Sequence, residues 1–218
     1  MRIGAMLALW GAAGCDGYSP VFTGSPVWQM FPFDGEREWN YVSTDQTIPY
    51  KMVVTSDGVA EVIGGENVYT LRYTKGCVAA SEECVDGDLL YQLRWASNAT
   101  YGTFVYAFDA GDGFQDFDPP VQITLDTMKR DDVVETSTAG ANWSSTMRGI
   151  EPCPIRMSAN WPECGAFSVE TDGGDGFPLA GDWWAVAGNG VAAFQLPSDT
   201  GQWQLSSFEC AGECDGTW

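Results

Sequence analysis

The feature that most constrains the fold is an alternation of apolar and polar side chains along short segments of the chain. Tyr69, Leu71 and Tyr73 alternate with Thr70 and Arg72. The same two-residue period recurs in residues 89–95, 104–108 and 121–125. Because successive side chains of a β-strand point to opposite faces, this period predicts strands with one buried face. No helical period of comparable length is present, so we expect an all-β fold with little helix, either an antiparallel β-sandwich or an open or half barrel.

The composition indicates a folded chain with an acidic surface. Of 218 residues, 44% are hydrophobic, and 10 Trp, 11 Phe and 8 Tyr are enough for a core, which argues against disorder. The formal net charge is -20 at pH 7. Such a surface repels nucleic acid, so we expect no nucleic-acid partner. A solvated acidic coat is one explanation of the charge, and cation binding is the other.

The amino terminus has the order of an export signal. Arg2 precedes an apolar run over residues 3–10, and the small residues 11–14 lead to Cys15. The run is too short to span a bilayer, which requires about 20 residues. The segment resembles the bacterial lipoproteins, whose leader is removed immediately before a cysteine that carries a diacylglycerol. The resemblance implies a signal peptide over residues 1–14, a lipid on Cys15 and a location in the bacterial cell envelope. The pattern departs from the family at Ala12, where Leu is usual, and a buried first strand with an ordinary thiol is the alternative.

A second pattern follows the predicted tether, residues 15–29. Residues 31–33 read Phe-Pro-Phe, and then come Gly35, Trp39 and Tyr41. A turn at residues 34–35 would lead into a strand whose two aromatic residues share one face. The segment resembles a group of β-rich bacterial lipoproteins that share Phe-Pro-Leu, then Gly, then Trp-x-Tyr. Residues 181–191 are similar to the closing hairpin of that group. The resemblance implies one exported β domain over residues 30–210 with a tail over 211–218, and it names no ligand.

The cysteines support export independently. Lipidation of Cys15 leaves six of the seven cysteines, and these lie as near neighbours: Cys77 with Cys84, Cys153 with Cys164, and Cys210 with Cys214. Disulfides belong to oxidising compartments. Zinc is the competing interpretation, but the chain has no histidine and no Cys-x-x-Cys pair, both of which are typical of zinc sites. We expect three local disulfides, although six cysteines allow fifteen connectivities.

The absence of histidine from the sequence removes several kinds of catalysis. Ser-His-Asp and Cys-His mechanisms require an imidazole base. A pair of carboxylates is the remaining option, as in glycoside hydrolysis, and the 30 acidic residues always offer a pair. Since nothing marks one pair above another, we expect no enzyme, and a carboxylate-dependent hydrolase is the third hypothesis.

One acidic motif occurs twice. The pattern Asp-x-Gly-Asp-Gly-Phe is found in residues 109–114 and 172–177. Calcium prefers six to eight oxygen ligands from closely spaced carboxylates and carbonyls, and Asp-Gly is also a common turn sequence. The order of an EF-hand is absent. The hypothesis is therefore either turns alone or calcium as the one possible cofactor, bound by Asp109, Asp112, Asp116, Asp118, Asp172 and Asp175.

The ten tryptophans raise the question of sugar binding. Exposed aromatic faces can stack on sugar rings, whereas buried ones form the core. Four tryptophans lie in turn-like or terminal contexts where we expect exposure: Trp28, Trp161, Trp203 and Trp218. The sequence favours a lipid-anchored envelope protein that acts as a non-catalytic binding or structural module. Its expected partners are the membrane, through the lipid, and a glycan, an acyl chain or another envelope protein. The alternative is a secreted carbohydrate-binding module stabilised by calcium.

Overall fold

The computed structural model describes residues 31, 33–77, 84–127, 129–138, 140–155, 163–173, 177–186 and 188–210. The predicted signal peptide, Cys15 and the two tails lie outside these ranges and stay predictions. Within the described ranges no segment is a helix long and apolar enough to cross a membrane. The strands are β1 (Glu36–Ser43), β2 (Tyr50–Ile63), β3 (Glu66–Cys77), β4 (Leu89–Asn98), β5 (Gly102–Asp109), β6 (Gln115–Thr124), β7 (Val133–Thr138), β8 (Ala141–Pro152), β9 (Glu163–Thr171), β10 (Gly181–Val186), β11 (Gly190–Gln195) and β12 (Trp203–Cys210).

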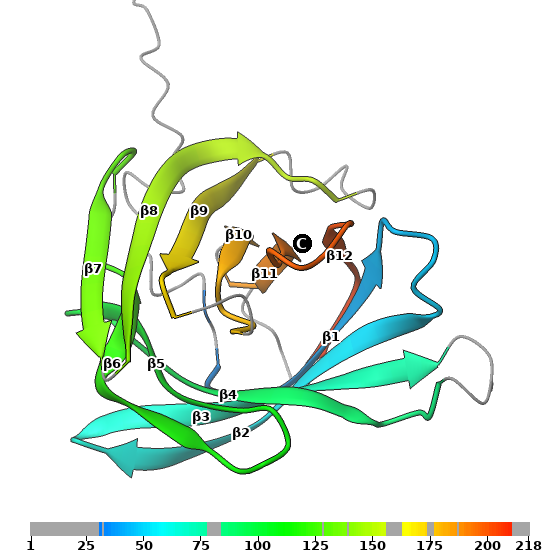
Figure 1. The fold of residues 1–218 in the computed structure, drawn as a ribbon, viewed down its shortest axis with the longest axis horizontal. Coiled ribbons are helices and arrows are strands. Elements are labelled where there is room, and N and C mark those ends of the chain that lie inside the picture. The colour runs from blue at the N-terminus through cyan, green and yellow to red at the C-terminus, as the bar shows by residue number, and fades with distance from the viewer. Residues whose placement is uncertain are drawn as a thin grey trace, which may run out of the picture.

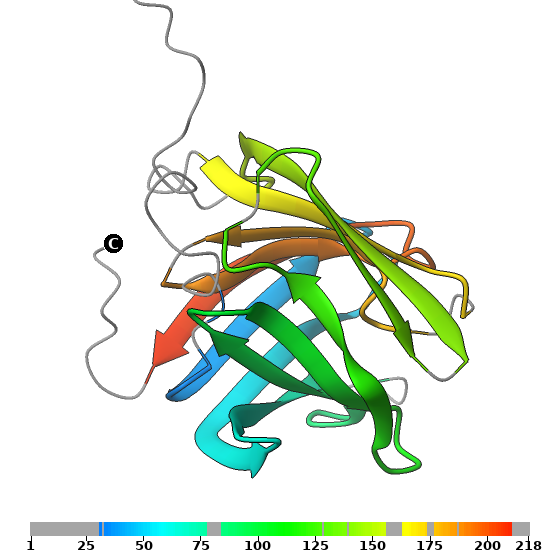
Figure 2. The same cartoon turned by 90° about the vertical axis from the view of Figure 1, so that its left-hand side faces the viewer.

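The described strands form one antiparallel sheet of twelve strands in the order β6-β5-β4-β3-β2-β1-β12-β11-β10-β9-β8-β7. The chain therefore runs up and down, and its first and last strands pair in the middle of the sheet. The sheet curls until its two ends, β6 and β7, lie beside each other (Figures 1 and 2). The prediction of an all-β antiparallel fold is confirmed, and the sheet is barrel-like and nearly closed.

The local predictions of strands are confirmed where the structure describes them. Residues 69–73, 89–95 and 104–108 lie within β3, β4 and β5. The predicted strand over 121–125 is the end of β6, which stops at Thr124. Trp39 and Tyr41 are both buried on one face of β1. The predicted closing hairpin is formed by β10 and β11, which pair antiparallel across a turn at Asn189.

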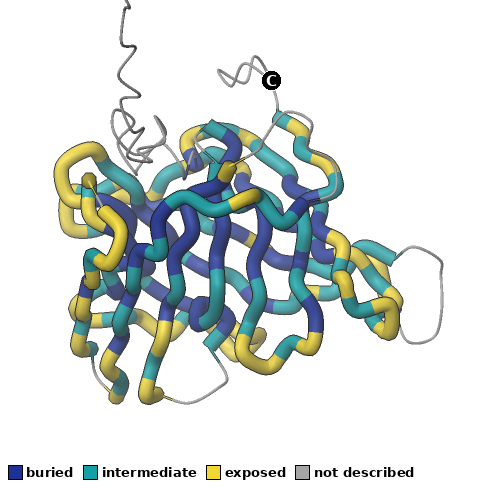
Figure 3. Tube along the Cα trace, turned by 90° about the horizontal axis from the view of Figure 1, so that it is seen from above, coloured by how far each residue is buried: buried dark blue, intermediate teal, exposed yellow. Residues whose placement is uncertain are grey.

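Aromatic side chains fill the interior of the barrel. Trp95, Trp183 and Trp203 are each at most 2% exposed. Phe31 and Phe33, which precede β1, lie in the same core, and the Phe31 ring stacks on Trp95 with 5.8 Å between centroids. Burial follows the strands, whereas exposed residues gather mainly at the connections (Figure 3). Since burying aromatic surface stabilises a domain strongly, this interior is the principal source of stability.

Two hydrogen bonds tie β1 to the hairpin of β10 and β11. The Trp39 indole N–H donates to the Asn189 carbonyl at 2.7 Å, and the Tyr41 hydroxyl donates to the Val191 carbonyl at 2.8 Å. Each bond joins residues 150 positions apart in the sequence. The polar atom of a buried Trp or Tyr usually finds a hydrogen-bond partner. The Trp-x-Tyr pattern of the sequence thus serves to hold opposite parts of the chain together.

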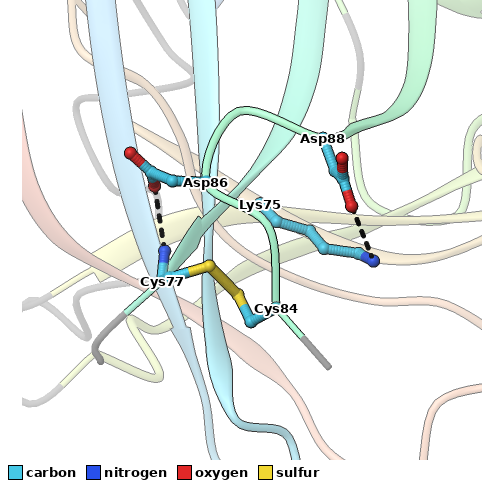
Figure 4. The surroundings of a disulfide bond; sticks show 5 residues. All are labelled: Lys75, Cys77, Cys84, Asp86 and Asp88. Atoms are coloured by element: carbon cyan, nitrogen blue, oxygen red, sulfur yellow. Dashed lines mark hydrogen bonds and ion pairs between the residues drawn. A yellow bond between two sulfur atoms is a disulfide. The ribbon is translucent and has the colours of Figure 1, made fainter. Parts of the chain in front are cut away.

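Two of the three predicted disulfides are confirmed. Cys77 pairs with Cys84, and Cys153 pairs with Cys164. The Cys77–Cys84 bridge closes the loop between β3 and β4, where the Asp86 carboxylate accepts a hydrogen bond from the Cys77 N–H at 3.0 Å (Figure 4). The predicted partner of Cys210, Cys214, lies outside the described residues, so the third pair stays a prediction.

Candidate functional site

Asp109 and Asp172, which begin the two copies of the Asp-Gly motif, lie at one end of the barrel. In a sheet whose strands alternate in direction, the connections that follow odd-numbered strands all meet at the same end. These connections include the loops after β5 and β9, which carry the two copies of the Asp-Gly motif. They also include the loops after β1 and β11, which meet at Asp45. We call this the aspartate end.

In the first copy of the motif, Asp109 organises the loop between β5 and β6. One carboxylate oxygen accepts hydrogen bonds from the N–H groups of Gly111 at 2.6 Å and Gly113 at 2.9 Å. The other accepts from the Gln92 amide at 3.1 Å. The N–H of Gly111 is the largest of the contacts that lower the pKa of Asp109. The Asp109 carboxylate therefore stabilises a turn. This is the role that the motif has when it forms turns alone and binds no calcium.

The end of this loop is held on the outer face of β4 by an aromatic contact. The Phe114 ring lies over the Arg94 guanidinium, with 4.1 Å between Cζ and the ring centroid. Arg94 also forms an ion pair with Glu61 at 3.3 Å. A cation held against a ring in this way is stabilised by the ring quadrupole. The loop is thus fixed at both of its ends.

The second copy of the motif is used differently. The Asp172 carboxylate accepts hydrogen bonds from the backbone N–H and the side-chain amide of Asn142, at 2.6 and 2.7 Å. The backbone N–H of Asn142 is the main cause of the lowered pKa of Asp172. Phe177 packs into an aromatic cluster with Trp143 at 5.2 Å and Phe108 at 5.4 Å between centroids. The first copy of the motif thus stabilises its own exposed loop, and the second copy packs its loop against the core through Phe177.

Among the residues that the structure describes, the proposed calcium ligands do not form one cluster. No group of three or more His, Cys, Asp or Glu suited to a metal ion occurs in the described part of the chain. Asp112, Asp116 and Asp118 lie along the loop and strand that follow Asp109, and the Asp118 N–H donates to Thr138. Asp175 lies outside the described residues. Calcium binding thus stays a prediction, and no described geometry supports it.

Sequence reasoning missed Asp45, which joins the loops after β1 and β11. Its carboxylate accepts hydrogen bonds from the Thr47 N–H at 2.9 Å, from the Thr47 hydroxyl at 2.7 Å and from the Thr200 hydroxyl. The Thr200 hydroxyl is the largest cause of a lowered pKa at Asp45. Gly201 lies so close that an added Cβ would be 2.6 Å from the Asp45 nitrogen. No local pattern signals the contact with Thr200, because it lies 155 residues from Asp45 in the sequence.

Open grooves lie on the strands that the structure describes. The first, of 540 Å³, crosses β12, β1, β2 and β3. Its floor contains a row of register partners that share the outer face: Glu209, Glu38, Thr55 and Arg72. We call it the β1 groove. Carboxylates, a hydroxyl and a guanidinium in one row can form hydrogen bonds to a polar ligand.

The other two grooves lie side by side over β7 to β11. One of 440 Å³ is lined by Glu135, Ser144 and Glu170, which are partners across β7, β8 and β9. The next, of 470 Å³, shares Glu170 and continues to Asp182 and Gln195. Together we call them the β8 grooves. Their hydroxyl, amide and carboxylate groups suit a polyhydroxylated ligand.

A charge network adjoins the β8 grooves at Asp182. The Arg148 guanidinium pairs with Asp182 at 2.9 Å and with Glu151 at 3.2 Å, and it lies 4.8 Å from the centroid of the Trp184 ring. The Trp184 indole N–H donates to Glu151 at 3.0 Å. Each charged group in this network has an oppositely charged partner, so we assign the network a structural role. Sequence reasoning did not identify this network.

The expectation that Trp203 is exposed is wrong. Its side chain is 2% exposed, and its indole N–H donates to the Asp199 carboxylate at 2.9 Å. Trp203 begins β12, and the curl of the sheet carries it into the core, which a turn-like context in the sequence does not reveal. Trp28, Trp161 and Trp218 lie outside the described residues, so their exposure stays a prediction.

No protein-family model matches the chain, and comparisons with curated proteins and with solved structures find no significant match.

Proposed function

We propose that the protein is an exported, lipid-anchored envelope protein that acts as a non-catalytic binding or structural module. The observation that carries the proposal is the contrast between the interior and the surface. The interior is filled by the protein's own aromatic side chains, whereas the grooves are open and polar. A ligand or partner protein then binds on the outer face of the barrel or at its ends.

Two further observations support this proposal. The bridges Cys77–Cys84 and Cys153–Cys164 are of a kind that forms in oxidising compartments. An acyl chain in the interior would have to displace Phe31 and Phe33, which are 2% and 5% exposed. We infer that the sheet is best regarded as an open barrel, because its strands form one continuous hydrogen-bonded sheet whose end strands, β6 and β7, do not pair with each other.

The test is the intact mass of the protein purified from membranes of a bacterial host. The expected mass is that of residues 15–218 plus the lipid, less two hydrogens for each disulfide. Alkylation before reduction should then label no thiol. A mass that begins at Met1, with every cysteine alkylated, would overturn both the anchor and the exported location.

The grooves favour a second candidate function, the binding of a glycan on the outer face. The row from Glu38 through Thr55 to Arg72 offers both acceptors and donors to sugar hydroxyls. A glycan array and pull-down on insoluble polysaccharides test it directly. Binding that is lost in Arg72→Ala but kept in Arg130→Ala, a charge-matched change outside the groove, would support it. Silence of the array together with no retention on any polysaccharide would remove it.

A further inference from the structure

The barrel has one junction where neighbouring strands do not form a ladder. β6 and β7 follow each other in the chain and lie in contact, yet they are the two ends of the sheet order. Among the described residues, no backbone-to-backbone hydrogen bond joins them. We call this junction the seam, and Figure 2 views the molecule from its side.

Threonine hydroxyls take the place of the missing carbonyl acceptors. The Asp118 N–H donates to the Thr138 hydroxyl at 3.1 Å, and the Gln122 N–H donates to the Thr136 hydroxyl at 3.1 Å. Between these two contacts lie Pro119 and Pro120, which have no N–H to donate. The hydrogen bonds seen across the seam among the described residues are therefore two bonds to threonine hydroxyls. They flank a stretch in which Pro119 and Pro120 cannot donate to a ladder.

The middle of β6 also lacks register partners in its other neighbour, β5. The register between them passes from Val105 with Val121 to Ala107 with Asp116. Residues 117–120 of β6 therefore have no register partner in β5. Because a strand gains its stability from pairing on both sides, the middle of β6 is poorly tied in both directions.

Two buried polar groups lie on β8, the strand next to β7. The Trp143 indole nitrogen and the Ser145 hydroxyl have no hydrogen-bond partner in the described part of the chain. Their side chains are 2% and 1% exposed. Leaving such groups buried and unpaired is unfavourable, and contact with water relieves this. These two groups beside the seam thus destabilise the closed state. Their contact with water in an opened state would remove this destabilisation.

We propose that the seam is a built-in opening of the barrel. β6 and β7 separate by breaking the two hydroxyl contacts and the packing of Phe117 on Trp143, while the laddered junctions stay paired. Separation uncovers the aromatic cluster that lies between β6 and β8, in which Phe117 and Phe177 pack against Trp143 at 5.7 and 5.2 Å between centroids. The opening is a property of the fold and does not depend on the proposed anchor or ligand.

Hydrogen–deuterium exchange of the native protein, followed by mass spectrometry, tests the proposal. We expect the β6 amides that are bonded across the seam, those of Asp118 and Gln122, to exchange at least about tenfold faster than the amides of β3 and β10, because local opening exposes them without global unfolding. In the double variant Thr136→Val/Thr138→Val the exchange of β6 should rise by about a further tenfold, since two N–H groups lose their acceptors.

A matched control is available in β3. The Thr74 hydroxyl donates to the Val53 carbonyl at 3.3 Å, but β2 and β3 also share a backbone ladder. Thr74→Val should therefore leave the exchange of every strand unchanged within about twofold. A pair of cysteines at Gln122 and Thr136, oxidised to a disulfide, should slow the exchange of β6 in the otherwise native protein. Equal exchange in the seam and in the laddered strands of the wild type would overturn the proposal, and so would equal acceleration of all strands in the double variant.

Discussion

Gly58 of β2 lies directly against Gly35. A Cβ atom added to Gly58 would be 2.5 Å from the carbonyl carbon of Gly35, and the φ angle of Gly58 is +67°. The register of β2 with β3 jumps between Ser56 and Ala60 at this point. The Ser56 hydroxyl donates to the Phe33 carbonyl at 3.3 Å. At this irregularity, β2 contacts the segment that precedes β1 and that places Phe31 and Phe33 in the core.

We expect Gly58→Ala to lower the free energy of unfolding by about 3 kcal/mol or more, because it combines overpacking against backbone with left-handed strain. Gly64→Ala is the control: its φ is also positive, at +62°, but nothing lies within 4 Å of the added Cβ. There the strain alone should cost about 1 kcal/mol. Urea unfolding measures both values, and equal losses would show that the contact with Gly35 is unimportant.

Removal of the Phe31 ring tests whether the segment before β1 is part of the core. The ring contacts Trp95 and Phe167 at 5.8 and 6.0 Å between centroids. Phe31→Ala should cost about 3–5 kcal/mol, as for other buried aromatic residues. Val59→Ala, at a side chain that is 69% exposed, should change stability by no more than about 0.5 kcal/mol. A similar small effect of both changes in urea unfolding would place Phe31 outside the core.

Acid should weaken the aspartate end first. Hydrogen bonds lower the pKa of Asp172 from its ordinary value of 3.8. A lowered folded pKa means that the ionised carboxylate stabilises the fold above pH 3.8, and that this contribution is lost as the pH falls through the folded pKa. Asp172→Asn should therefore melt at a lower temperature than the wild type at pH 7, with a difference that shrinks below pH 3.

The control for this prediction is Asp116→Asn. Within the described residues no hydrogen bond to the Asp116 side chain is seen, so its substitution should leave the melting temperature nearly unchanged at both pH values. If Asp172→Asn and Asp116→Asn gave the same pH profile, the contacts with Asn142 would not contribute to acid stability.

Asp199 should behave in the opposite way. Burial raises its pKa above the ordinary value of 3.8, against the hydrogen bond from Trp203. A raised folded pKa means that the protonated form is favoured in the fold, so stability is lost as the pH rises through the folded pKa. Asp199→Asn keeps an oxygen acceptor for the Trp203 indole and removes the charge. We expect a higher melting temperature than the wild type at pH 7 and no gain at pH 3; a lower one at pH 7 would contradict this.

Much of the local structure was predictable because its signals act over a few residues. The alternation at Tyr69, Leu71 and Tyr73 predicts a strand, and β3 is that strand. The spacing of Cys77 and Cys84 suggested a local pair, and the pair is present. The candidate site was less predictable. The repeated Asp-Gly motif suggested turns alone or a calcium site, and in the structure Asp109 holds its own loop whereas Asp172 holds Asn142 of another strand.

The sequence by itself determined the strands, the turns, two local disulfides and the acidic character of the chain, because each depends on composition or on neighbouring residues. Only the tertiary structure decided the pairing of β1 with β12, the seam between β6 and β7, and the burial of Trp203 and Phe31. These features depend on contacts such as the bond from Trp39 to Asn189, 150 residues away. The curl of the whole sheet brings such groups together, and no short segment of the chain encodes that curl.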